Sequence, residues 1–103
     1  MIDVIKISKA LSDPIRYRIL VMLLNHERGE LEGLCCSTPE EGVCNCDIVS
    51  TFGMLQSRVS YHMKELTNSG LVREEPRGKW KYYFLNKETI EAYIRQIKKD
   101  FKL

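Results

Sequence analysis

Four cysteines fall within one polar stretch of the chain, between Asn25 and Asp47. They are Cys35, Cys36, Cys44 and Cys46. Thiolates are soft ligands that select soft ions, so this cluster predicts a site for a thiophilic metal or metalloid. The same thiols could instead form reversible disulfides and act as a redox switch. A set of unligated structural cysteines is the weaker interpretation, because the residues around them are polar.

The spacing of Cys44 and Cys46 restricts the backbone that presents both thiols to one ion. Residues two apart point to nearly opposite sides of a helix, but to the same side of an extended segment. We therefore expect a non-helical chain at the pair, directly before a third helix that begins near Asp47. An ion held there would constrain or unwind the start of that helix and shift the element that follows.

The connection at about residues 26–46 is long for a compact domain, which is typical of a functional loop. Its middle, Thr38 to Gly42, has a candidate N-cap, a proline at the first helical position and a closing glycine, so it predicts one helical turn. Such a turn would bring Cys35 and Cys36 back toward the other two cysteines. His26 could contribute a nitrogen ligand, but it is better interpreted as a solvated loop histidine.

A polar helix face follows the cysteines. The apolar residues Val59, Met63 and Leu66 recur at helical spacing, which predicts a helix from Gln56 to Thr67 with one face in the core. The opposite face carries side chains that can contact DNA bases and phosphates in a major groove, namely Gln56, Ser57, Arg58, Ser60, Tyr61 and Lys64. An ordinary solvated face is the alternative.

A basic hairpin comes next. Gly70 is placed to end the helix, and Leu71 to Leu85 alternate in polarity around a turn at Pro76-Arg77-Gly78. We expect three aromatic side chains to pack inward and the basic ones to lie on the other face with Tyr83. The inward set is Trp80, Tyr82 and Phe84, and the outward basic set is Lys79 and Lys81, with Arg77 at the turn.

Three more helices frame these sites. The first is predicted at Ile2 to Leu11, and the second begins at Asp13-Pro14, a capping residue followed by a first-turn proline, and runs to about Asn25. The last, Lys87 to Phe101, has an apolar side that includes Ile94. Either it pairs with the first helix and the same two helices of a second chain, or both helices cover their own core.

Length and composition are those of one soluble domain over residues 1–103. The chain is 44% hydrophobic and 29% charged, and it has no apolar run near the ~20 residues of a membrane span and no visible signal peptide. We therefore expect a cytoplasmic protein with reduced thiols. The net charge of +2 is uninformative, but residues 26–50 hold one basic and six acidic side chains. An enzyme is disfavoured, because the chain lacks a C-x-x-C pair, a phosphate loop and a histidine beside a cysteine.

Three segments resemble the ArsR/SmtB family of metal-sensing repressors, over roughly Leu11 to Leu85. Its second helix is similar to LSDPIRYRILVMLL, its helix-turn-helix to CNCDIVSTFGMLQSRVSYHMKELTNSGLV, and its wing to EEPRGKWKYYFL. The resemblance implies a mainly α fold with a small β-hairpin: a winged helix-turn-helix of about five helices and a two-stranded wing. It also implies a homodimer, paired through the first and last helices, that binds a pseudo-palindromic operator and is released by a metal or metalloid.

The resemblance also assigns roles on the DNA. Gln56, Ser57, Ser60, Tyr61 and His62 match positions that approach the major groove, while Arg58 and Lys64 match phosphate contacts. His62 is equally well interpreted as a packed residue. Leu55 stands where the family often has serine, so the helix lacks an obvious cap. Arg77 and Lys79 on the wing would reach an adjacent minor groove or the backbone.

The inducer follows from which ligands are present. The last helix has no histidine, so the zinc or nickel site that relatives carry there is absent. The pair Cys44 and Cys46 resembles those of arsenic sensors and of cadmium/lead sensors, but Val49 stands where arsenic sensors often have a third cysteine. Cys35 or Cys36 must then complete the site. We favour arsenite or antimonite, As(III) or Sb(III), which need three thiolates, over Cd(II) or Pb(II), which could use all four.

Overall fold

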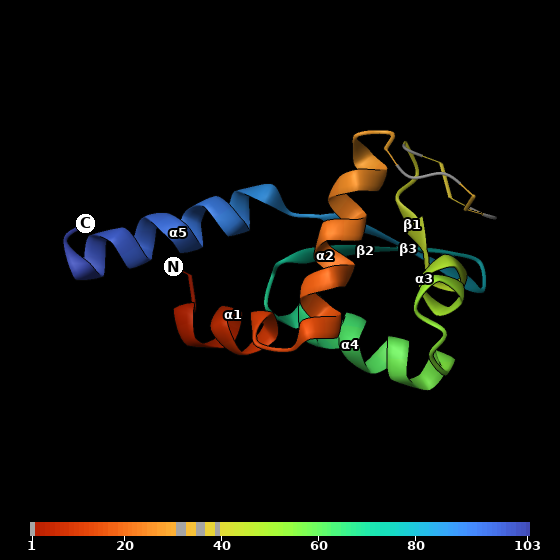
Figure 1. Ribbon diagram of the computed structural model, residues 1–103, viewed down its shortest axis with the longest axis horizontal. Coiled ribbons are helices and arrows are strands. Elements are labelled where there is room, and N and C mark those ends of the chain that lie inside the picture. The colour runs from red at the N-terminus through yellow and green to blue at the C-terminus, as the bar shows by residue number, and fades with distance from the viewer. Residues whose placement is uncertain (1, 31–32, 35–36, 39) are drawn as a thin grey trace.

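The elements that the sequence predicts are present in the computed structural model, which describes residues 2–30, 33–34, 37–38 and 40–103 (Figure 1). In this part of the chain there are five helices and three strands: α1 (Val4–Leu11), α2 (Pro14–Glu27), β1 (Val43–Cys44), α3 (Asn45–Phe52), α4 (Gln56–Asn68), β2 (Val72–Arg77), β3 (Trp80–Leu85) and α5 (Lys87–Phe101). The mainly α winged helix-turn-helix is confirmed, with one strand more than expected. No helix among these residues is long and apolar enough to cross a membrane.

Side-chain caps fix where the first two helices begin. The Asp3 carboxylate accepts a hydrogen bond from the backbone N–H of Lys6 at 3.0 Å, so α1 begins at Val4 rather than at Ile2. Asp13 does the same for α2, accepting two backbone N–H groups at 2.8 and 3.2 Å. Both are N-caps, which satisfy amides that the first helical turn leaves without partners.

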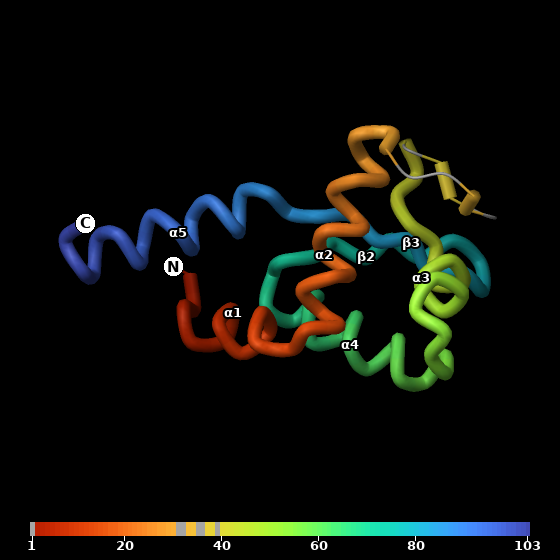
Figure 2. Tube along the Cα trace, in the orientation of Figure 1, coloured from red at the N-terminus to blue at the C-terminus, as the bar shows by residue number. Residues whose placement is uncertain are grey.

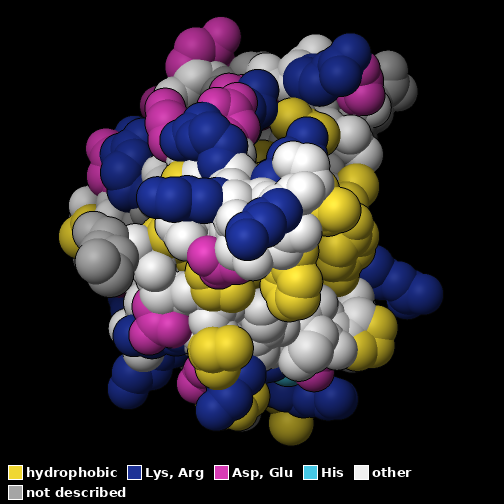
Figure 3. Space-filling model, turned by 90° about the vertical axis from the view of Figure 1, so that its left-hand side faces the viewer, with side chains coloured by type: hydrophobic (Ala, Val, Ile, Leu, Met, Phe, Trp, Pro, Cys, Tyr) yellow, Lys and Arg dark blue, Asp and Glu magenta, His cyan; other side chains and the backbone are white. Residues whose placement is uncertain are grey.

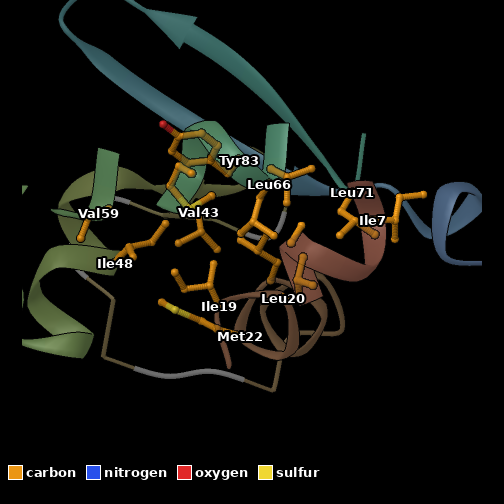
Figure 4. Close-up of a cluster of buried hydrophobic side chains, with 14 residues drawn as sticks. Ile7, Ile19, Leu20, Met22, Val43, Ile48, Val59, Leu66, Leu71 and Tyr83 are labelled. Atoms are coloured by element: carbon orange, nitrogen blue, oxygen red, sulfur yellow. The ribbon is translucent and has the colours of Figure 1, made fainter. Parts of the chain in front are cut away.

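The core lies where α2, α3, α4 and the sheet meet (Figure 4). Ile19, Ile48 and Leu66 are fully buried there, one from each of the three helices. The apolar stripe predicted for α4 is buried in full, which holds the helix so that its polar side faces out. Truncating one such buried aliphatic side chain to alanine typically costs about 2–5 kcal/mol of unfolding free energy.

The wing is part of a three-stranded antiparallel sheet in the described chain, in the order β1-β3-β2. β1 lies along the edge of β3 that the hairpin leaves open, and Val43 pairs with Tyr83. Tyr83 is 3% exposed and Trp80 is 41% exposed, so the predicted faces of β3 are wrong. The reason is that both strand faces carry aromatic residues, and the docking of β1 and α3 selects the Tyr83 face for the core.

The aromatic face that remains outward is covered by arginine side chains of β2. The Arg73 guanidinium lies 4.2 Å from the ring centroid of Phe84, and that of Arg77 lies 4.8 Å from the ring centroid of Tyr82. Stacking of a guanidinium on an aromatic face is favourable and keeps the charge near water. The outer face of the wing is therefore both aromatic and basic.

The turns differ in detail from those predicted. The hairpin loop is Gly78 and Lys79, with Gly78 at φ +63°, while Pro76 lies within β2. Between Thr38 and Gly42 there is no helical turn among the described residues: the Glu41 N–H donates to the Thr38 carbonyl at 3.0 Å, and Thr38 pairs with Gly42 across the turn. Gly42 has φ +80°, and a Cβ there would lie 2.6 Å from the Tyr83 carbonyl oxygen.

The last helix has the predicted bounds and extends away from the body, at the same end as α1 (Figures 1 and 2). None of the residues of α5, all of which are described, is buried. Tyr93 ties it to α1 through a hydrogen bond between its hydroxyl and that of Ser8 at 2.8 Å. Ile94 and Phe101 are 48% and 73% exposed, and hydrophobic side chains gather between Lys and Arg on this end of the molecule (Figure 3). The apolar side of α5 is therefore not fully covered by the rest of this chain.

Candidate thiol site and nucleic-acid interface

Cys44 and Cys46 converge at the start of α3, with their Sγ atoms 2.8 Å apart. Cys44 is the N-cap residue, with extended backbone at φ −68° and ψ 144°, and Cys46 lies in the first helical turn. The helix begins at Asn45, two residues before the predicted start at Asp47, so the expectation that both cysteines are non-helical is wrong. One extended residue at the cap is enough to turn both thiols to one side. Cys44 is fully buried and Cys46 is half-buried, so the pair is open on one side.

The loop that leads to this pair is anchored at Ser37. The Ser37 hydroxyl accepts the backbone N–H of Cys44 at 2.8 Å and donates to the carboxylate of Asp47 at 2.5 Å. Asp47 is 3% exposed, so this contact lies inside the fold. Cys35 and Cys36, the other two predicted ligands, lie outside the described residues. Among those that are described, no group of three or more His, Cys, Asp or Glu side chains is arranged to hold a metal ion.

A second anchor comes from α2. His26 is 5% exposed in the last turn of that helix, and its Nε2 lies 2.7 Å from the Thr38 carbonyl oxygen. Its interpretation as a solvated loop histidine is therefore wrong, because α2 continues two residues past Asn25 and carries the ring into the interior. His26 and Ser37 together hold the segment on the N-terminal side of β1.

The predicted nucleic-acid face of α4 is at the surface. Six of the nine predicted DNA-binding residues are exposed on this helix: Gln56, Ser57, Arg58, Ser60, Tyr61 and Lys64. As expected, Leu55 gives the helix no side-chain cap in the described structure, so amides of the first turn remain available. The Gln56 end of α4 and the hairpin turn both lie at the end of the molecule opposite α5 (Figure 1).

The two wing residues differ in their surroundings. Lys79 is exposed on the turn, with its Nζ 5.4 Å from the ring centroid of Trp80. Arg77 is half-buried and forms ion pairs with Glu75 at 3.1 Å and with Glu41 of the cysteine loop at 3.7 Å. The hydrogen bond from Arg77 lowers the pKa of Glu75 below its usual value, so that carboxylate stays charged beside the arginine. Part of the charge of Arg77 is therefore neutralised within the protein.

His62, the ninth predicted contact, is 4% exposed and cannot lie on that face. Its Nδ1 is 3.1 Å from the guanidinium of Arg16 on α2, and its Nε2 is buried without a hydrogen-bond partner among the described residues. Burial lowers the pKa of His62 below 6.5, Arg16 and Arg58 add to this, and the charges of Asp13 and Glu65 oppose it. The sequence held the signal, since position 62 falls on the same apolar stripe as Val59 and Met63.

Asn45 is a residue that the sequence analysis did not single out. Its Oδ1 accepts the backbone N–H of Lys81 in β3 at 3.3 Å and the thiol of Cys44 at 3.5 Å. It therefore connects the cysteine pair with the wing. Lys81 itself pairs through its Nζ with Glu74 across the hairpin at 3.6 Å.

Comparison with known proteins gives one family and several relatives. The family described as "Bacterial regulatory protein, arsR family" matches residues 40–74. The chain is 33% identical over 88 residues to the arsenical resistance operon repressor of Bacillus subtilis (strain 168), covering 85% of this chain and 70% of that one. It is 30% identical over 94 residues to a cadmium resistance transcriptional regulatory protein CadC homolog of Staphylococcus aureus, covering 91% of this chain and 66% of that protein.

A solved structure agrees with the fold. A crystal structure of an ArsR family transcriptional regulator superposes with a TM-score of 0.68 at 21% identity, covering 99% of this chain and 97% of that chain. At this level of identity the likeness concerns the arrangement of helices and wing, and not the thiol site.

Proposed function

Because the chain belongs to the arsR family of bacterial regulatory proteins, we propose that it represses transcription from a pseudo-palindromic operator and releases that DNA when arsenite or antimonite binds its cysteines. The family consists of DNA-binding transcription regulators and not of enzymes, so double-stranded DNA is the partner. We propose three further points: the identity of the inducer, the cysteines that hold it and the homodimer.

The observation that carries the proposal is the 2.8 Å separation of the Cys44 and Cys46 sulfur atoms at the start of α3. Two neighbouring thiols, one buried and one half-buried, suit a soft ion that enters from one side. As(III) needs a third thiolate, which we assign to Cys35 or Cys36. The anchoring of Ser37 to Cys44 supports this assignment, because Ser37 directly follows those two cysteines in the chain.

The position of the pair supports a direct effect on DNA binding. α3 packs against α4, and the two helices are joined only by residues 53–55, with Gly53 in the left-handed conformation at φ +60°. A ligand that fixes the first turn of α3 therefore acts on the helix that bears the polar DNA face. We assign Gln56, Ser60 and Tyr61 to base edges and Arg58 to phosphate, while His62 positions α4 from within the core.

The exposed apolar side chains of α1 and α5 support the homodimer. Ile5 is 65% exposed on α1, and Ile94 and Phe101 are exposed on α5, at one end of the molecule. An apolar crevice continues this surface between α2 and α5, lined in part by Tyr17 and Val21. Soluble monomers rarely expose contiguous apolar surface, and a second copy would cover it. A two-fold dimer would then present two α4 helices to two half-sites.

The test is fluorescence anisotropy of the reduced protein on a labelled operator duplex, titrated separately with arsenite and with Cd(II). We expect binding in the absence of either ion and release by arsenite. Cys44→Ser and Cys46→Ser should bind the duplex as the wild type does and remain bound in arsenite. Cys35→Ser and Cys36→Ser serve as a matched pair, because loss of release in one of them identifies the third thiolate.

Two outcomes would replace the proposed inducer. Release by Cd(II) alone would indicate a four-sulfur cation site, in line with the name of the cadmium-resistance relative. Release by neither ion, but by a thiol oxidant, would indicate a redox switch, for which two sulfurs at 2.8 Å are also suitably close. Loss of DNA binding in Cys46→Ser without any ion would contradict the sensor assignment altogether.

A further inference from the structure

The side chain of Asn45 takes the place of a missing strand residue at the edge of the wing. β1 pairs with β3 as far as Cys44, whose partner is Tyr82. The next pair would join Asn45 to Lys81, but the backbone turns into α3 at Asn45 and cannot continue the ladder. Its side-chain oxygen accepts the Lys81 N–H instead, at 3.3 Å. The edge of the wing is thus held by the residue between the two cysteines.

Binding of one ion to both cysteines changes the surroundings of the Asn45 side chain, because the Cys44 thiol that donates to its Oδ1 at 3.5 Å becomes a thiolate without a proton. With a metal–sulfur distance of about 2.3 Å, as in zinc thiolate sites, and an angle of 100–110°, two sulfurs on one ion lie about 3.5–3.8 Å apart. The thiols here are 2.8 Å apart, so the two side chains must rotate to separate the sulfurs when they share an ion. The Asn45 oxygen then faces a thiolate in place of a donor, and the hydrogen bond that this oxygen accepts from the Lys81 N–H is already long for an amide donor at 3.3 Å.

The wing residues on the far side of this bond bear the charge that DNA would meet. Lys79 in the turn is followed directly by Trp80, Lys81 and Tyr82 in β3. A second contact from the cysteine segment, the 3.7 Å ion pair of Glu41 with Arg77, reaches the same hairpin. The wing is therefore held by two contacts from the cysteine segment, those of Asn45 and Glu41, which are separate from the contact between α3 and α4.

We infer that Asn45 is a positioning residue that couples the thiol site to the wing. In the absence of inducer, Asn45 holds β3 in the position in which the wing binds DNA. Inducer binding breaks the hydrogen bond between Asn45 and the Lys81 N–H, so the wing and α4 both release the DNA. The inference rests on the proposed function, since it requires a ligand on Cys44 and Cys46. It adds a second route from that ligand to the DNA.

Trp80 makes the wing directly observable, because it is the one tryptophan in the sequence and is adjacent to Lys81. The reduced protein without DNA is titrated with arsenite, and binding is followed by the absorbance of the arsenic–thiolate bonds. In the wild type, the emission of Trp80 should change in proportion to binding. In Asn45→Ala, arsenite should bind with the same stoichiometry and the emission should not respond.

Two affinities separate coupling from a merely structural role. Asn45→Ala should bind arsenite about two- to tenfold more tightly than the wild type, because no hydrogen bond has to be broken; that factor is the usual net value of one such bond. The same variant without arsenite should bind the operator more weakly by a similar factor. A residue needed only for folding would weaken both. Asn45→Asp, which keeps an acceptor oxygen, should restore the emission response.

Lys81→Ala is the matched control, since it removes the cation and keeps the backbone N–H. It should weaken DNA binding and leave the Trp80 response to arsenite intact. An unchanged response in Asn45→Ala, with arsenite bound, would overturn the coupling while leaving the proposed function standing. Failure of the wild type to bind arsenite at all would refute the proposed function, and the coupling with it.

Discussion

Acidification should destabilise the folded protein through His62. The imidazole is 4% exposed, its Nε2 has no partner in the described structure, and its Nδ1 lies 3.1 Å from the Arg16 guanidinium. Protonation would add a buried N–H donor without an acceptor and a second positive charge beside Arg16. Burial accordingly lowers the pKa of His62 below its ordinary 6.5, with Arg16 and Arg58 adding to it and Asp13 and Glu65 opposing it.

The sign and size of this change in the free energy of unfolding follow from proton linkage. Because the folded pKa is the lower one, the unfolded chain binds more protons below pH 6.5, so the free energy of unfolding falls as the pH falls. A histidine that stayed fully neutral in the folded state would cost about 1.4 kcal/mol between pH 7.5 and pH 5.5, which is the upper bound for His62, and the loss ends below the folded pKa. Above pH 7.5 the effect vanishes, because the histidine is neutral in both states.

The assay is urea unfolding of the wild type and of His62→Gln at pH 7.5, 6.5 and 5.5, at one protomer concentration, because dimerisation would make the stability depend on concentration. Titrating groups that do not interact with His62 contribute equally to both proteins, so the difference between them reports His62 together with its coupling to Asp13 and Glu65. The wild type should lose up to about 1.4 kcal/mol more than the variant over this range. Parallel pH profiles, or a wild type that gains stability relative to the variant in acid, would refute the reasoning.

Three further predictions concern single side chains. Asp13→Ala removes the acceptor that caps α2 at 2.8 and 3.2 Å, and should lower the free energy of unfolding by about 1 kcal/mol in the same urea titration. Lys79→Ala should weaken binding about equally on operator and unrelated duplexes and lower the salt dependence by about one counterion. Gln56→Ala should instead relax base preference by about 1–3 kcal/mol, and anisotropy on both duplexes distinguishes the two variants. Ile94→Glu places a charge on the exposed apolar side of α5 and should shift the protein toward monomer in sedimentation, and a dimer of unaltered strength would place the interface elsewhere.

Local chemistry is what the sequence predicts well here. The start of α2 at Asp13-Pro14 follows from a capping residue, and the bounds of α5 at Lys87–Phe101 follow from helical periodicity; both are confirmed. The burial of Val59, Met63 and Leu66 follows from spacing alone. Each of these features is decided within one or two helical turns, so no distant part of the chain is needed to predict it.

The faces of the wing could not be predicted in this way. β3 carries aromatic residues on both faces, so alternation is satisfied whether Trp80 or Tyr83 packs inward. The choice depends on β1, a two-residue strand some 40 positions earlier, which pairs Val43 with Tyr83 and brings that face onto the core. A segment so short has no periodicity of its own that the sequence could show.

The candidate thiol site could likewise be predicted from the sequence only in part. The residue types alone predict Cys44 and Cys46 as soft ligands and the exposed side of α4 as a surface for DNA. The structure adds that a single extended residue, at the cap of α3, is enough to turn both thiols to one side, with the sulfurs 2.8 Å apart. It also joins Asn45 to Lys81 and His62 to Arg16, contacts between residues 36 and 46 positions apart. Periodicity reports which side of an element is apolar, but only packing decides which polar groups meet across elements.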